Sequence, residues 1–354
     1  MQFRKGGILS NKLTKIICNV VFLLLCIGLT FYFVFRGQDF QALAHYIANS
    51  SQSFWIAGFG LVVVYILFES IIFYYLLSVF NEKAHLGHCF LYSFVVFFFS
   101  LTTPGAMAGQ PMQLLFMKRD GLNFSSCVVI LLLVTIAFKS VLILIGLVVL
   151  VVQPPLVMAL LEPIMGWFWL GMVLNAACVG GMLALVFIPS IAGSVAHGFI
   201  NIAGVFAGKT RADVWHESIV TAMHNYSEVS SFVRKHPMVS ANVMLLTIVQ
   251  RCLLFAVTYV VFVSFGMYSV SLPETIMLQG SISLSADMLP LPGGLGISEH
   301  LYNVIFNPIC GEALTTSTLV ISRGLSFYAQ LLVSALFTVV AYLRIFTVKK
   351  EAEE

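Results

Sequence analysis

Six charged side chains lie inside long apolar stretches of the sequence, where a charge is costly and therefore informative. They are Lys139, Arg251, Arg323, Glu69, Asp287 and Glu299. Each would cost about 2.5 to 3.5 kcal/mol at the centre of a helix exposed to lipid, so we expect all six to face protein or water. One interpretation is structural, with three buried ion pairs that lock a helix bundle. The other is functional: the cations bind a phosphate or another anion, and the carboxylates balance them or receive an amine.

Arg323 is the strongest single candidate for an anion-binding residue, because a guanidinium can grip phosphate through two parallel hydrogen bonds. Asp287 and Glu299 are the only plausible general bases if the protein is an enzyme. We assign no catalytic residue, and the scattered cysteines and loop histidines predict no metal site. No nucleotide-binding glycine-rich loop is present, and the sequence predicts no cofactor.

Two breaks with the same Pro-Gly punctuation interrupt the apolar segments. The first contains Pro104, Gly105, Gly109 and Gln110, and the second contains Pro292, Gly293, Gly294, Gly296 and Glu299. The apolar pieces beside each break are shorter than the roughly 20 residues that a helix needs to cross the hydrocarbon core. We therefore expect two re-entrant hairpins, over residues 89–117 and 274–306. Proline ends the first half-helix because it removes a backbone donor, and glycine permits the positive φ that a turn needs. The second half-helix of each hairpin then begins at mid-depth, where its free amide groups could bind an anion. The alternative is that the turns serve only to fold the hairpins.

Composition places these elements in a membrane. Apolar residues make up 60% of the chain and charged residues 9%, with a mean hydropathy of +0.99. We predict an all-α polytopic membrane protein with full spans near 16–35, 54–80, 127–152, 164–188, 239–267 and 313–346. The formal charge of +3 is too small to suggest a nucleic-acid partner.

The distribution of basic residues gives the expected orientation. With the N-terminus inside and both hairpins re-entrant, Arg36 is the only basic loop residue outside, as the positive-inside rule favours, and both termini are cytoplasmic. The two hairpins then insert from opposite sides, which predicts inverted-topology repeats with a substrate site between them. The alternative is two unrelated hairpins. The expected organisation is an N-terminal span and loop over 1–53, a first repeat over 54–152, a connecting span and amphipathic linker over 153–238, a second repeat over 239–347 and a cytoplasmic tail over 348–354.

The second break also carries a family resemblance. Residues 289–299, Leu-Pro-Leu-Pro-Gly-Gly-Leu-Gly-Ile-Ser-Glu, followed by Ser322-Arg323-Gly324, resemble the PxPGGxGxxE and downstream Arg signature of the transmembrane domain of lysylphosphatidylglycerol synthases and their stand-alone flippase-like relatives. Residues 103–110 resemble the weaker first-half element. The sequence departs from the pattern at Gln110, where the family has Glu, at Gln113, where it often has Arg, and over 133–139, where a Glu-Arg element is replaced.

The resemblance implies the lipid-translocating half of the family without the soluble aminoacyl-transferase domain. The expected function is flipping of a polar-headed phospholipid, with aminoacylated phosphatidylglycerol or a glycolipid as candidates, across the bacterial cytoplasmic membrane. The expected partners are membrane lipids with polar or anionic headgroups, with a second copy of the chain or a separate lipid-synthesising enzyme as further candidates. The alternatives are a lipid-modifying transferase of the phosphatidylglycerol lysyltransferase type and an ion-coupled solute transporter.

Overall fold

A computed structural model describes most of the chain as a bundle of helices. The described residues are 52–83, 85–103, 106–188, 190–191, 193–195, 198, 226–289, 291, 294 and 296–348. Among them are helices and no strands. The expected first span at 16–35 lies outside these residues, and so do Pro104, Gly105, Pro292, Gly293 and most of the amphipathic linker, of which residues 226–235 are helical.

Five helical segments of the described chain are long and apolar enough to cross a membrane. They are Ser53–Val79, Phe124–Val152, Pro155–Phe187, Pro237–Ser264 and Leu314–Ile345. Each coincides with one of the predicted spans, apart from the start of the third, which lies nine residues before the predicted Ile164. The prediction of an all-α polytopic membrane protein is therefore confirmed.

The span-forming helices begin and end where local sequence requires it. In chain order they are α3 (Gln52–Val79), α6 (Phe124–Val152), α7 (Pro155–Leu161), η1 (Glu162–Ile164), α8 (Met165–Phe187) and α11 (Pro237–Ser264). The last span comprises α14 (Glu312–Arg323), the π-helical η2 (Gly324–Ala329), α15 (Gln330–Tyr342) and the π-helical η3 (Leu343–Val348). Asn123 caps α6 by accepting a hydrogen bond from the backbone N of Ser125 at 2.9 Å. Pro155 and Pro237 stand at the starts of α7 and α11, where no intrahelical donor is lost.

Each Pro-Gly break separates two short helices that pack against each other. The first hairpin is α4 (Leu86–Thr102) with α5 (Gly109–Arg119), and the second is α12 (Leu272–Ala286) with α13 (Ile297–Cys310). Their lengths of 17, 11, 15 and 14 residues all fall short of the roughly 20 needed for a span. The two hairpins match the predicted ranges 89–117 and 274–306. Their re-entrant insertion, the inverted repeats and the domain bounds stay predictions.

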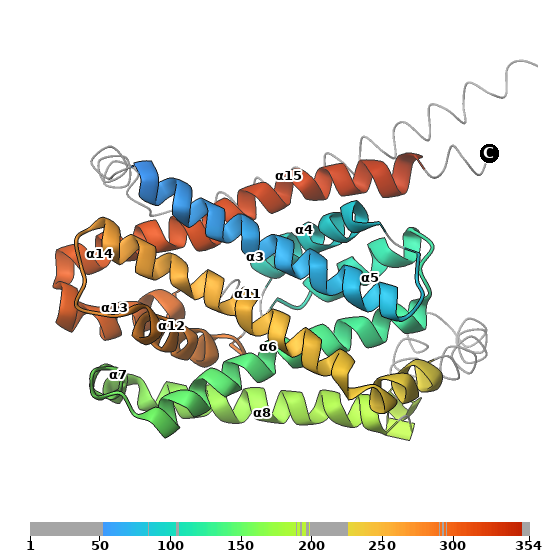
Figure 1. The fold of residues 1–354 in the computed structure, drawn as a ribbon, viewed down its shortest axis with the longest axis horizontal. Helices are drawn as coiled ribbons and strands as arrows, with labels where there is room; N and C mark the ends of the chain where they lie inside the picture. The colour runs from blue at the N-terminus through green and yellow to red at the C-terminus, as the bar shows by residue number, and fades with distance from the viewer. Residues whose placement is uncertain are drawn as a thin grey trace, which may run out of the picture.

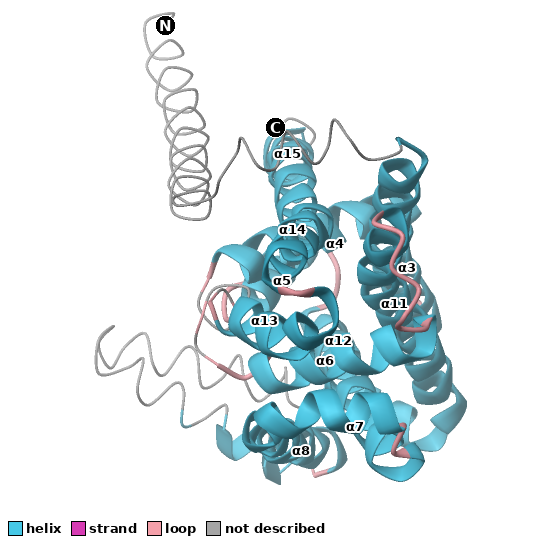
Figure 2. Ribbon diagram, turned by 90° about the vertical axis from the view of Figure 1, so that its left-hand side faces the viewer, coloured by secondary structure: helices cyan, strands magenta, loops and turns pink. Residues whose placement is uncertain are grey.

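The long helices flank the hairpins. In Figure 1, α3, α6, α8, α11 and α15 extend along the long dimension of the molecule, with the first hairpin towards one end and the second towards the other. Figure 2 looks along that dimension and shows α5, α12 and α13 between α15 above and α8 below, with α3 and α11 side by side on the right. Because α11 packs on both α3 and α6, the N-terminal and C-terminal halves interlock.

Backbone contact between α8 and α12 fixes the second hairpin from one side. A Cβ at Gly171 would lie 2.3 Å from the carbonyl oxygen of Leu284, so only glycine allows this approach. Asn175, one turn later on α8, donates from Nδ2 to the carbonyls of Gly171 at 3.0 Å and Leu284 at 3.3 Å. Close contact at a small residue, supported here by the side-chain amide of Asn175, is a common way for helices to associate inside a membrane, where the hydrophobic effect does not drive them together.

Candidate functional site

The two Pro-Gly breaks line one cavity of about 610 Å³ in the middle of the bundle. Ala106, Met107 and Gln110 reach it from the first break, and Asp287, Leu291 and Gly294 from the second. Its wall mixes these groups with apolar side chains of α3, α4, α6, α11 and the last span. Segments almost 200 residues apart thus meet at one cavity.

The predicted charged residues converge on this cavity. Those that line it are Glu69, Lys139, Arg251, Asp287 and Arg323. Glu299 stands beside the wall as the partner of Arg323. The charges are therefore clustered rather than dispersed through the bundle, and their individual contacts distinguish the structural role from the functional one.

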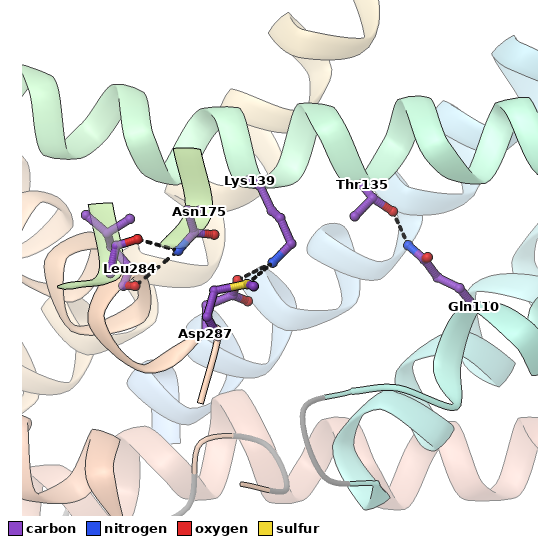
Figure 3. A network of polar contacts seen from close by, with 8 residues as sticks. Gln110, Thr135, Lys139, Asn175, Leu284 and Asp287 are labelled. Atoms are coloured by element: carbon purple, nitrogen blue, oxygen red, sulfur yellow. Dashed lines mark hydrogen bonds and ion pairs between the residues drawn. The ribbon is translucent and has the colours of Figure 1, made fainter. Parts of the chain in front are cut away.

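Lys139 and Asp287 form an ion pair across the cavity wall, drawn in Figure 3. Lys139 Nζ on α6 donates to Asp287 Oδ2 at 2.6 Å and also contacts Met288 Sδ at 3.0 Å. Both side chains are largely buried, with 11% and 18% exposed. Since Asp287 directly follows α12, this pair joins the second hairpin to a helix of the first half.

Glu299 and Arg323 form the second pair. Arg323 Nε lies 3.0 Å from Glu299 Oε1, while Glu299 Oε2 accepts from the backbone N of Gly296 at 2.6 Å. The carboxylate is thus fixed at the start of α13 and orients the guanidinium. Arg323 Nη2 is buried without a hydrogen-bond partner among the described residues. One face of this arginine is therefore occupied by protein, and one donor is left over.

Arg251 has a different environment. Its guanidinium lies 3.8 Å from the ring centroid of Phe138 and 5.3 Å from that of Tyr65, both cation-π contacts. Its Nε is buried without a partner in the described part of the chain, and no described carboxylate forms an ion pair with it. Glu69, which is buried nearby, accepts instead from Gln250 Nε2 at 2.7 Å. The described structure therefore contains two of the three ion pairs that the structural interpretation expected.

The first break carries neutral polar groups. Gln110 donates from Nε2 to Thr135 Oγ1 on α6, as Figure 3 shows, and Thr135 lies one turn before Lys139. Gln113 is buried, and its Nε2 has no partner among the described residues.

Glycines shape both breaks. A Cβ at Gly109 would lie 2.0 Å from Ser100 Oγ, so this glycine permits close contact between α4 and α5. Gly294 and Gly296 adopt φ values of +69° and +86°, the left-handed region predicted for the second turn.

Several neutral residues of the site were not predicted. Thr135, Gln250, Phe138 and Tyr65 all line the cavity; Thr135 contacts Gln110, and the other three contact Glu69 or Arg251. Gln250 precedes Arg251, and Thr135 precedes Lys139 by four residues, so proximity to a charged residue was the available signal. Phe138, directly before Lys139, and Tyr65, four residues before Glu69, carried the same signal. Among the described residues, no group of three or more His, Cys, Asp or Glu side chains could hold a metal ion.

Comparison with known proteins places this arrangement in a family. A search of curated proteins found no match to the chain. The family described as "Lysylphosphatidylglycerol synthase TM region" matches residues 16–334, which include both hairpins and every charged residue of the cavity. This match covers most of the chain and agrees with the signature at the second break. The chain belongs to the family of the lysylphosphatidylglycerol synthase transmembrane region.

Proposed function

We propose that this protein moves a polar-headed phospholipid between the leaflets of a bacterial cytoplasmic membrane. The headgroup occupies the cavity between the two breaks while its acyl chains stay in the bilayer. The observation that carries the proposal is a pair of arginines, Arg251 and Arg323, on the wall of one cavity of about 610 Å³, each with a buried guanidinium nitrogen that has no hydrogen-bond partner among the described residues. Buried polar groups are normally satisfied, so two guanidinium groups that the described residues satisfy incompletely, beside the same cavity, favour an anionic ligand there.

The contacts of the two arginines suit a phosphate diester. Glu299 orients Arg323 and the ring of Phe138 orients Arg251, so little side-chain freedom is lost when a phosphate binds. The carboxylates compensate the cations when the cavity is empty, which keeps the buried charge close to balanced. Glu69, Asp287 and Glu299 are also the groups that would receive an amine on the headgroup, and Gln110 adds a neutral hydrogen-bonding group.

Transport then requires the cavity to open towards each side in turn. The two hairpins are the elements that separate it from the ends of the bundle, since their breaks form part of its wall. Movement of either hairpin away from the longer helices would open one side while the other stays closed, as in transporters built around a fixed central site.

Reconstitution in liposomes tests the proposal. Fluorescent phosphatidylglycerol and its lysyl ester are loaded, and the fraction protected from a membrane-impermeant quencher is followed over time. We expect wild-type protein to move at least one of these lipids and Arg323→Ala to lose most of that activity, because the oriented donor is gone. Arg344→Ala, which removes an exposed arginine from η3, is the matched control.

Three outcomes would contradict the proposal. Equal rates for wild-type and Arg323→Ala protein would remove the arginine from the transport step. A change in the chemical identity of the lipids would favour a transferase, although the two candidate bases, Asp287 and Glu299, are each held by a cation. Binding of a water-soluble anion with no lipid movement would favour a solute transporter.

A further inference from the structure

Polar residues recur at every fourth position along the last membrane span. They are Thr318, Ser322, Ser326, Gln330, Ser334 and Thr338. The stripe covers about 20 residues, or roughly 30 Å of helix, which is close to the thickness of the hydrocarbon core. It therefore offers hydrogen-bonding groups over nearly the whole depth of the membrane on one helix.

The stripe faces the interior of the protein. Thr318, Ser322, Gln330, Ser334 and Thr338 are each at most 5% exposed, and Ser326 is half-buried. On an unbroken α-helix of 3.6 residues per turn, a four-residue repeat would wind around the axis. The π-helical segment η2, Gly324–Ala329, lies in the middle of the stripe, and its wider turns counteract that drift. The polar residues consequently stay on the inward side for longer than an α-helix would allow.

The central part of the stripe belongs to the cavity. Ser322, Ser326 and Gln330 line its wall next to Arg323. Ser322 is also joined to α11 through a contact of 2.7 Å with Thr258 Oγ1. These groups are explained by the site described above.

Beyond the cavity, the stripe continues between α15 and α4, where the site does not account for it. Ser334 is fully buried, and its hydroxyl has no hydrogen-bond partner among the described residues. Thr338 Oγ1 lies 3.4 Å from the carbonyl oxygen of Phe94, a long hydrogen bond. The surroundings are aromatic, with the rings of Phe94 and Phe337 stacked at a centroid distance of 4.4 Å. A fully buried hydroxyl without a partner in such surroundings is unfavourable, so packing alone would be met better by alanine.

We infer that the seam between α4 and α15, marked by Ser334 and Thr338, is the route by which the lipid headgroup leaves the cavity. The inference rests on the proposed function and names the path for the same substrate. The seam leads to the end of the bundle where η3 meets α5, and the last turn of α5 carries Lys118 and Arg119. When α4 separates from α15, the two hydroxyls replace water around the phosphate, and the aromatic side chains meet the acyl chains.

The test uses the liposome assay with variants that keep side-chain size. Ser334→Ala and Thr338→Val each remove a hydroxyl; we expect the double variant to slow lipid movement about tenfold, the effect of losing roughly one hydrogen bond to a charged group. Thr338→Ser retains the hydroxyl and removes only a methyl group, and it should stay near the wild-type rate. Ser78→Ala and Thr316→Val remove exposed hydroxyls from other helix faces and serve as matched controls.

Thermal unfolding of each variant separates the route from a structural role. Slower transport at an unchanged unfolding temperature supports the inference. Unchanged transport in the double variant, while Arg323→Ala is inactive, overturns the route but leaves the proposed function intact. If wild-type protein moves no lipid, the proposed function fails and the route fails with it. Equal slowing in the control pair would show a general effect of hydroxyl removal and would also overturn it.

Discussion

The two hairpins share their Pro-Gly punctuation but are held at their tips by different interactions. Asp287 and Glu299, the charged tip of the second hairpin, are each paired with a cation from another helix, Lys139 and Arg323. Gln110 and Gln113, the neutral tip of the first hairpin, have one hydrogen bond to Thr135 and one buried amide without a partner among the described residues.

The base of the first hairpin is held more firmly than its tip. Asp120, just after α5, contacts both His88 and Tyr92 of α4. These contacts tie α4 and α5 to each other but not to the helices around them. Separating either of the two largely buried ion pairs would leave charges unpaired, which costs more than breaking a neutral contact, so we expect the first hairpin to move as a unit while the second stays fixed. The following variants test this difference.

The largest effect is expected at the charged tip. Lys139→Met leaves Asp287 buried without its cation, and we expect the free energy of unfolding to fall by about 3–5 kcal/mol. Unfolding in detergent by heat or denaturant measures the loss. Lys83→Met, which replaces an exposed lysine, should change stability by less than about 0.5 kcal/mol.

A double variant distinguishes loss of the pair from loss of packing. Lys139→Met with Asp287→Leu removes both charges, and most of the stability should return because no charge is left unpaired. If the double variant is as unstable as Lys139→Met alone, lost packing rather than an unpaired charge causes the instability, and the contrast between the hairpins is wrong.

The architecture followed from sequence because the bilayer restricts it. A run of about 20 apolar residues has few alternatives to a spanning helix, and this gave five spans within the described residues. The third span begins earlier than predicted because Pro155 starts α7, a position where its missing N–H costs no intrahelical hydrogen bond. Both hairpins were predictable because proline and glycine interrupt segments that are too short to span.

The site was predictable in its charges but not in its pairing. Charged residues within apolar segments must be sheltered, and this rule singled out six residues, of which five line the cavity. Which cation meets which carboxylate depends on how helices distant in sequence are tilted, and Arg251 shows the consequence: its cation contacts aromatic rings rather than a described carboxylate. The asymmetry of the tips was visible only as the departure at Gln110, and its partner Thr135 was marked only by its position four residues before Lys139.

A moderate effect is expected from Gly109→Ala in the first hairpin. The added Cβ would lie 2.0 Å from Ser100 Oγ and 3.0 Å from the carbonyl oxygen of Val96, so α4 and α5 must separate. We expect a loss of about 1–3 kcal/mol in unfolding free energy, the usual cost of overpacking. Gly60→Ala in α3, where nothing lies within 4 Å of the added Cβ, should be neutral or stabilising. Equal stability of the two variants would show that the hairpin does not depend on close contact at Gly109.

The smallest and most specific effect is expected from Thr135→Val. The substitution removes the acceptor of Gln110 and costs about 0.5–1.5 kcal/mol, so the neutral tip should open more often while the charged tip is unaffected. Hydrogen exchange should therefore accelerate by about tenfold at most in residues 106–119 and remain unchanged in 296–310. Because a moving first hairpin opens the cavity, lipid movement should not fall in this variant. Faster exchange in both hairpins would mean that they open together, and the division into a fixed and a moving hairpin would have to be abandoned.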